Sequence, residues 1–417
     1  MTLAAPPKRG TVSPNLVSLH GELFDRKTGF LAQYNVEREE QIELLGLSLI
    51  SGIDPLFLGD PGVGKTWMIE LMLMCLNGTS DKDFFNTLVF KETPADDILG
   101  PRSLPGMKAG RIERLSEGYL PTAVVGYLDE IFKSSPTLVN SLLDLFANRK
   151  LKVGANIIDC SQLLCIFGSS NELPDREDML PFRDRFGLTN FVPAVRSPEG
   201  RIRVMRIQDE FQSGGSTIDL SNAPRLSLDD VRTMRQEVTG IILPDSLIES
   251  MNKAQERWAS AGHPPSQRRI GQMLKAIKAR AWIRGSDHAT TDDMIVCQHM
   301  AWNQPDDAKS AHDIIMEFAN VFARKASRTR EALEPILAKL DEVKADIGSE
   351  EPSEDQMAEA FKVMRDLRRM KRETKDQIDQ GTTQGHDVTD LEAVMSTISD
   401  AYTWVEKTMT GEEGDEN

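Results

Sequence analysis

The segment GDPGVGKT, residues 59–66, constrains the fold of this chain more than any other feature. It has the spacing G-x-x-x-x-G-K-[ST], follows the apolar run PLFLG and opens the helix-like run TWMIELMLMCL. Glycines let the loop backbone turn its N–H groups toward anionic oxygens, and a helix N-terminus adds its dipole. The pattern predicts a phosphate-binding loop between a buried strand and a helix, with these candidate nucleotide-binding residues: Asp60, Pro61, Gly62, Val63, Gly64, Lys65, Thr66 and Trp67.

Short apolar runs alternate with helix-like segments from residue 17 to about residue 195. Several runs are apolar throughout, as expected for strands buried on both faces of a parallel sheet. The predicted strands are 55–59, 88–92, 123–130, 161–170 and 190–195, and the clearest helices are 67–75 and 136–147. This alternation predicts an α/β sandwich with a parallel sheet. Residues 149–159 predict an inserted hairpin that turns near Gly154.

Two adjacent acids end the third apolar run, in the segment YLDE at 127–130. Beside a phosphate loop, Lys65 is expected to reach the β- and γ-phosphates of ATP, and the Thr66 hydroxyl to ligate Mg²⁺. Asp129 is expected to hold the same Mg²⁺ through water, and Glu130 to polarise the attacking water as a general base. The acidic pair therefore favours ATP hydrolysis over phosphate transfer to a small substrate.

Three further polar residues are candidates for the same chemistry. Asn171, in SSNELP after the fourth run, is expected to orient the attacking water, although asparagine is also a common turn residue. In FRDRF at 182–186, an arginine either is solvated at the surface or reaches the γ-phosphate of a neighbouring subunit in a ring. Arg268 opens a helix in the following helical region and is placed to sense the nucleotide from that side.

Taken together, these segments resemble the MoxR family of AAA+ ATPases, and most closely its RavA-like subgroup. The resemblance rests on GDPGVGKT, LDEIFKSSPTLVNSLLDLF, GSSNELP and DRF, and continues through ETPADDILGPRSL, GRIERLSEGYLPTA, LSLDDVRTMRQEVTGIILPD and SQRRIGQMLKAIKARAW. It covers roughly residues 17–320. After that point this chain departs from RavA, because only helices are expected where RavA has a β-rich insertion.

The resemblance implies an ASCE-type αβα core with an all-α lid, assembled as a homo-hexameric ring that binds ATP and Mg²⁺ between subunits. It implies that Asn171 is the first sensor, Arg185 rather than Arg183 the arginine finger, and Arg268 the second sensor. Tyr34, Asn35 and Val36 occupy the position that flanks adenine in the family. Family members act as chaperone-like remodellers of protein clients, often with a partner that has a von Willebrand factor A (VWA) domain.

The chain divides into four predicted parts. Residues 1–16 form a flexible arm, 17–222 the ATPase core with a helix-2 insert near 100–120, 223–320 a helical lid, and 321–417 a helical extension. In the extension, apolar residues at helical spacing predict three amphipathic helices separated near Pro352 and 381–387. They are expected to form a bundle or a coiled coil, followed by an acidic tail.

Composition sets limits on location and partners. The 49 basic and 65 acidic residues give a net charge of −16, which argues against nucleic acid as the main partner. No apolar run reaches the roughly 18 residues of a membrane helix, the first residues lack a secretory pattern, and four dispersed cysteines indicate a reducing compartment. A cytoplasmic protein is therefore expected. Two alternatives stay open: a motor or loader on nucleic acid through the basic segment 365–372, and a scaffold that binds ATP with negligible turnover.

Overall fold

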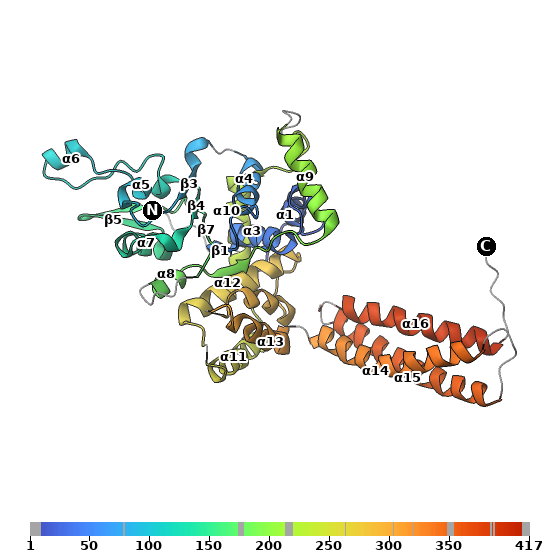
Figure 1. The fold of residues 1–417 in the computed structure, drawn as a ribbon. Coiled ribbons are helices and arrows are strands. Elements are labelled where there is room, and N and C mark those ends of the chain that lie inside the picture. Colours follow the sequence, from blue (N-terminus) through green and yellow to red (C-terminus); the bar gives the residue numbers. More distant parts are fainter. Residues whose placement is uncertain are drawn as a thin grey trace. The chain divides into compact units, whose positions relative to one another are not determined.

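The computed structural model describes two compact units of the chain (Figure 1). The first comprises residues 1–245, 258–289 and 296–311, and the second residues 246–257, 290–295 and 312–417. The described residues are 10–77, 80–173, 179–212, 220–262, 264–302, 304–319, 321–347, 354–383, 386 and 388–410. Residues 1–9 of the predicted arm, Pro352 and residues 411–417 of the acidic tail lie outside this set. The four predicted domain limits remain predictions.

A five-stranded, all-parallel sheet forms the centre of the first unit. Its order is β3-β4-β7-β1-β8, with bounds Phe84–Leu88, Val125–Asp129, Cys165–Ser170, Pro55–Leu58 and Leu188–Phe191. The central strands β1 and β7 are buried along their whole length. The predicted α/β fold with a parallel sheet is confirmed. Because β7 lies between β1 and β4, residues that follow these three strands meet at one edge of the sheet.

The strand predicted at 88–92 is wrong by about four residues. The structure has β3 at Phe84–Leu88, and Phe90 beyond it is 54% exposed. The polar pair Asn86-Thr87 obscured this strand because β3 lies at the sheet edge, where polar side chains are tolerated. The last strand, predicted at 190–195, likewise ends at Phe191. The predicted hairpin is confirmed as β5 Lys150–Val153 and β6 Asn156–Asp159.

Helices of the first unit surround this sheet, and several begin at clear capping residues. Ser135 caps α7, Ser227 and Asp230 form a capping box on α10, and Ser266 caps α12. The helices are α1 Pro14–Phe24, α2 Phe30–Tyr34, α3 Glu39–Ser51, α4 Lys65–Met74, α5 Ala95–Leu99, α6 Leu104–Lys108, α7 Pro136–Asn148, α8 Leu180–Arg183, α9 Pro198–Gln212, α10 Leu228–Gly240 and α12 Gln267–Ile283. Short strands β2 Leu76–Asn77 and β9 Leu226–Ser227 pair separately, and α11 Asp245–Ser260 and α13 Asp307–Ala319 each belong in part to both units.

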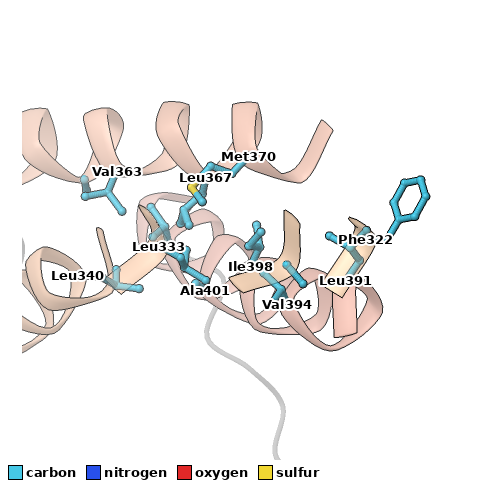
Figure 2. Close-up of a cluster of buried hydrophobic side chains, with 13 residues drawn as sticks. Phe322, Leu333, Leu340, Val363, Leu367, Met370, Leu391, Val394, Ile398 and Ala401 are labelled. Carbon is cyan, nitrogen blue, oxygen red and sulfur yellow. The ribbon is translucent and has the colours of Figure 1, made fainter. Parts of the chain in front are cut away.

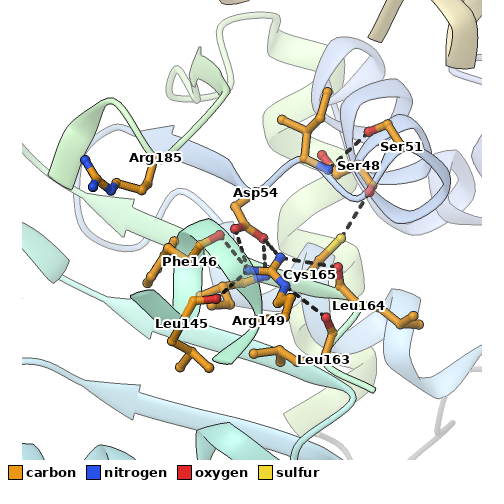
Figure 3. A network of polar contacts seen from close by, with 12 residues as sticks. Ser48, Ser51, Asp54, Leu145, Phe146, Arg149, Leu163, Leu164, Cys165 and Arg185 are labelled. Carbon is orange, nitrogen blue, oxygen red and sulfur yellow. Dashed lines mark hydrogen bonds and ion pairs between the residues drawn. The ribbon is translucent and has the colours of Figure 1, made fainter. Parts of the chain in front are cut away.

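A buried ion pair joins the amino end of the sheet to the end of α7 (Figure 3). The guanidinium of Arg149 contacts both carboxylate oxygens of Asp54, at 2.6 and 3.0 Å, and Asp54 also accepts a hydrogen bond from the backbone N–H of Ile166. Arg235 of α10 donates to the carbonyls of Leu49 and Leu164 beside this pair. Three strand and helix ends are thereby fixed around one carboxylate.

The second unit contains a three-helix bundle made of α14 Val321–Ile347, α15 Glu354–Thr383 and α16 Thr389–Thr410. Its core draws on all three helices (Figure 2): Phe322, Ala326, Leu333, Leu340, Ala360, Val363, Leu367, Met370, Leu391, Val394, Ile398, Ala401 and Val405. The three predicted helices are confirmed. Phe361 fits the helical spacing of the apolar residues of α15, but it is 55% exposed. No helix in the described part of the chain is long and apolar enough to cross a membrane.

Candidate functional site

The predicted phosphate loop connects β1 to α4 in a conformation that depends on glycine. Gly62 and Gly64 have φ of 79° and 90°, which side-chain-bearing residues rarely adopt, and Gly64 directly precedes the first turn of α4. At Gly59, a Cβ would lie 2.4 Å from the carbonyl oxygen of Val192, so the close approach of the residue that follows β8 excludes a side chain. The loop therefore presents backbone groups at a helix N-terminus, as an anion site requires.

Two pockets flank this loop. The first has a volume of about 620 Å³ and is lined by Pro61, Gly62, Gly64, Lys65, Thr66, Trp67, Glu70, Leu88, Val89, Phe90, Asp129, Glu130, Lys133 and Asn171. The second has a volume of about 530 Å³ and is lined by Tyr34, Asn35, Val36, Arg38, Gly62, Val63, Gly64, Trp67, Ala194, Val195, Val204, Ile207 and Gln208. Charged groups line the first pocket, which suits the phosphates of a nucleotide, and we call it the phosphate-side pocket. Apolar groups line most of the second, which suits the base, and we call it the base-side pocket. Asp60 is exposed and is not among the lining residues of either pocket.

Lys65 lines the phosphate-side pocket and is itself buried. Its Nζ donates to the carbonyl oxygen of Gly59 and to Oδ1 of Asn171, the latter at 3.2 Å. Burial lowers the pKa of Lys65, and the carboxylates of Asp129 and Glu130 oppose this shift. Because Asn171 follows β7, between β1 and β4, the sheet order itself brings the candidate sensor to the phosphate loop.

The acidic pair at the end of β4 faces the same pocket, and Glu130 is held in an unusual state. It has a left-handed φ of 55° and is 8% exposed. Its buried Oε2 has no hydrogen-bond partner in the described structure, although Nζ of Lys133 lies 3.4 Å away as an ion pair. A strained backbone and an unsatisfied buried oxygen both have an energetic cost, and both are typical of functional residues.

A hydrogen-bonded chain connects the two candidate Mg²⁺ ligands, and sequence reasoning missed its middle members. Tyr127 Oη lies 3.2 Å from Oγ1 of Thr66 and 2.9 Å from Oγ of Ser169, and Ser169 donates to Oδ1 of Asp129. Burial raises the pKa of Tyr127 to about 12, so its hydroxyl stays protonated. Tyr127 and Ser169 lie on strands β4 and β7 and read as ordinary sheet residues, so only the three-dimensional register reveals them.

The base-side pocket joins residues that are distant in the sequence. Tyr34, Asn35 and Val36, the predicted adenine neighbours, line it together with Trp67. Nε1 of Trp67 donates to the carbonyl oxygen of Tyr34 at 3.3 Å, which fixes one wall to α4. The rest of the apolar lining was not predicted: it comprises Ala194 and Val195 after β8, and Val204, Ile207 and Gln208 of α9.

The structure places the three candidate arginines away from both pockets, since neither lining includes Arg183, Arg185 or Arg268. Arg183 is 3% exposed and packs over the ring of Trp302 at 5.6 Å, and burial followed by Arg269 lowers its pKa to about 10. Arg185 is half-buried, and its Nη1 donates to the carbonyl oxygen of Pro181.

One carboxylate links this arginine segment to the start of α12. Asp184, which lies between Arg183 and Arg185, accepts a hydrogen bond from Ser266 at 3.0 Å and forms ion pairs with Arg268 at 3.5 Å and Arg269 at 3.4 Å. Arg269 is itself buried and donates to the carbonyl oxygen of Met300. Asp184, the neighbour of the candidate finger in the sequence, therefore pairs with the candidate second sensor in the same subunit.

The fold and its helical region are those of an AAA+ protein. Residues 24–210 match the model of the MoxR domain in MoxR–vWA–β-propeller ternary systems, and residues 244–315 match the model of an AAA lid domain. The crystal structure of a candidate ATPase from Cytophaga hutchinsonii superposes with a TM-score of 0.58 at 15% identity, over 73% of this chain and 95% of that one. At that identity the likeness shows the fold alone.

Three sequence relatives extend over most of this chain, and one of them is a MoxR protein. An uncharacterized protein of Methanocaldococcus jannaschii is 29% identical over 317 residues, which are 76% of this chain and 81% of the relative. A second uncharacterized protein of that organism is 28% identical, over 71% and 74%. The MoxR protein of Methylorubrum extorquens is 23% identical, over 63% and 81%. Together these matches support a MoxR-family AAA+ ATPase.

Proposed function

We propose that this chain hydrolyses ATP at the edge of the sheet where β1, β4 and β7 end. The observation that carries this proposal is the meeting of Lys65, Asn171 and the pair Asp129-Glu130 in one pocket beside the phosphate loop. Lys65 binds the β- and γ-phosphate oxygens, and Asn171 orients the attacking water. Glu130 accepts the proton of that water on Oε2, which forms an ion pair with Lys133 but has no hydrogen-bond partner in the described structure.

The oxygen donors of this pocket also suit Mg²⁺ bound together with the nucleotide. Thr66 supplies a hydroxyl and Asp129 a carboxylate, both hard ligands, and the chain through Tyr127 and Ser169 orients them. When bound, Mg²⁺ neutralises charge on the phosphate oxygens. Thr66 would hold it directly and Asp129 through water.

We further propose that the active form is a homo-hexameric ring. Hydrolysis would then need Arg185 from the adjacent subunit as an arginine finger, with Arg268 sensing the nucleotide from the helical side. Supporting this, neither arginine lines the pockets of its own subunit. Burial of Arg183 under Trp302 makes Arg185 the better candidate of the two.

We propose that this ATPase cycle drives the remodelling of a protein client, in a chaperone-like role. Exposed apolar side chains on and after α6, within the predicted insert, offer a surface for such a client: Leu104, Met107, Ile112 and Leu115. The family model matched by residues 24–210 is named for systems that also contain vWA proteins, which supports a VWA-domain partner. The RavA-like subgroup and a cytoplasmic location remain our predictions.

Phosphate release by the purified chain, with ATP and Mg²⁺, tests the central proposal. Glu130→Gln should bind ATP as the unchanged chain does and lose at least about a hundredfold in turnover. Glu117→Gln, which alters an exposed glutamate outside both pockets, is the matched control. Full turnover by Glu130→Gln would refute the role of Glu130. Binding without measurable turnover by the unchanged chain would instead favour the scaffold alternative.

One observation keeps the nucleic-acid alternative open. Arg365, Arg368 and Arg372 lie on one exposed face of α15, and within the described residues none of them forms an ion pair. The test is binding to single- and double-stranded DNA and RNA across a salt series, since phosphate contacts produce a steep dependence on salt. The absence of salt-sensitive binding would dismiss this alternative.

A further inference from the structure

We propose that Glu37 positions α9 against the base-side pocket and thereby sets the affinity for the nucleotide base. The inference rests on the proposed ATPase function and adds a positioning residue to its nucleotide site. In the described structure Glu37 does not line either pocket, and it lies one residue beyond the predicted adenine neighbours. Its effect would pass through α9, which supplies Val204, Ile207 and Gln208 to the lining of that pocket.

The carboxylate of Glu37 receives three hydrogen bonds from the segment that opens α9. The backbone N–H of Arg196 donates to Oε2 at 2.7 Å, while the backbone N–H and the hydroxyl of Ser197 donate to Oε1 at 2.9 and 2.5 Å. The Ser197 hydroxyl, the Arg196 N–H and the Ser197 N–H, in that order of effect, lower the pKa of Glu37 to about 2. The group is therefore an ionised acceptor at every physiological pH.

Arg38, the next residue, ties the same turn to the phosphate loop. Its guanidinium is buried and donates to the carbonyl oxygen of Val63 at 2.9 Å and to that of Glu37 at 2.6 Å. Glu37 itself has a left-handed φ of 54°, a strained conformation for a glutamate. Residues 37 and 38 thus connect the phosphate loop on one side with the start of α9 on the other.

The packing around Gly200 shows how closely α9 fits this carboxylate. A Cβ on Gly200 would lie 2.6 Å from Oε1 of Glu37 and 2.7 Å from Oγ of Ser197, nearer than real Cβ contacts come. A second contact, from Arg203 to the carbonyl oxygen of Gln33, holds α9 on α2. Val204, Ile207 and Gln208, which lie four to eight residues after Gly200, line the pocket. A shift of the first turn of α9 would therefore move the wall that faces the base.

The experiment compares two ligands, ATP and inorganic tripolyphosphate, by calorimetric titration of the full chain. Tripolyphosphate fills the phosphate side only, so it reports on the loop without the base. Glu37→Gln should weaken ATP binding about tenfold, the scale of one charge-assisted hydrogen bond, and leave tripolyphosphate binding within about twofold. Glu199→Gln is the control, because Glu199 is an acid in the first turn of α9, and in the described structure the carboxylate that accepts from Ser197 is that of Glu37.

A second variant keeps the test decisive if Glu37→Gln folds poorly. Gly200→Ala should displace the carboxylate and give the same selective loss of ATP binding, and the double variant should be no weaker than the weaker single one. Equal losses for ATP and tripolyphosphate, or no loss for either, would overturn the positioning role. If the unchanged chain binds neither ligand, the proposed ATPase function fails instead.

Discussion

Oδ1 of Asn171 accepts a hydrogen bond from Nζ of Lys65 at 3.2 Å, which connects the ends of β7 and β1 across the phosphate-side pocket. We expect Asn171→Ala to reduce ATP turnover about a hundredfold while changing the ATP dissociation constant by less than about threefold, because the role proposed for the amide is to orient the attacking water. Single-turnover kinetics separates the two quantities. Asn156→Ala, on the exposed hairpin, should change neither. A large loss of ATP binding with unchanged turnover would contradict the sensor role.

The hydroxyl of Tyr127 should influence the response to Mg²⁺. Tyr127→Phe keeps the buried ring and removes the hydrogen bonds to Thr66 and Ser169. We expect the Mg²⁺ concentration for half-maximal hydrolysis to rise severalfold, as is usual when a group supporting a metal ligand is lost. Ser169→Ala should act in the same direction through Asp129. An unchanged Mg²⁺ titration curve in both variants would show that this hydrogen-bonded chain is structural only.

Arg183 and Arg185 should have different roles, with Arg183 needed for stability and Arg185 for catalysis. Arg185→Ala is expected to retain its melting temperature and nucleotide binding and to lose at least a hundredfold in hydrolysis. Arg183→Ala should lower the melting temperature, because Arg183 is buried against Trp302. Mixing Arg185→Ala with Glu130→Gln subunits tests action between subunits. Partial recovery of activity is expected if the two residues serve the same site from different chains, and its absence would count against a trans finger.

Acid should destabilise the first unit through His20. This ring lies between Phe24 and Trp282, and burial lowers its pKa from 6.5 to about 4, with a backbone hydrogen bond to Gly46 opposing the shift. Between pH 6.5 and 4 the unfolded chain binds the proton and the folded chain does not, so stability falls as pH falls through this window. Melting temperatures measured from pH 7 to 4 should fall less steeply for His20→Phe. Parallel curves for the two proteins would rule out His20 as the cause.

The sequence predicts the chemistry of the phosphate-side pocket well because that chemistry is local. GDPGVGKT and YLDE each follow a strand, and a parallel sheet brings the ends of its strands to one edge. The strand predicted at 88–92 was misplaced because apolar residues near the end of a strand can belong to the pocket and not to the sheet. The apolar residues Val89 and Phe90 line the pocket beyond the strand end, while the true strand contains Asn86 and Thr87.

What the sequence could not show depends on contacts between distant segments. The pairing of Glu37 with Ser197 spans 160 residues, and no spacing rule connects them. Tyr127 has the pattern of a buried sheet residue, and its role follows only from its distances to Thr66 and Ser169. Phe361 fits the helical period of α15, but the bundle covers a narrower face than the period suggests.

Asp184 connects residues 183–185 to the start of α12. Since its carboxylate contacts Ser266, Arg268 and Arg269, we expect a displacement of the loop that carries Arg185 to move the first turn of α12 as well. In a ring, the loss of a γ-phosphate at one interface would thus displace α12 of the neighbouring subunit. The carboxylate of Asp184 would then couple the nucleotide state of one site to that of the next site.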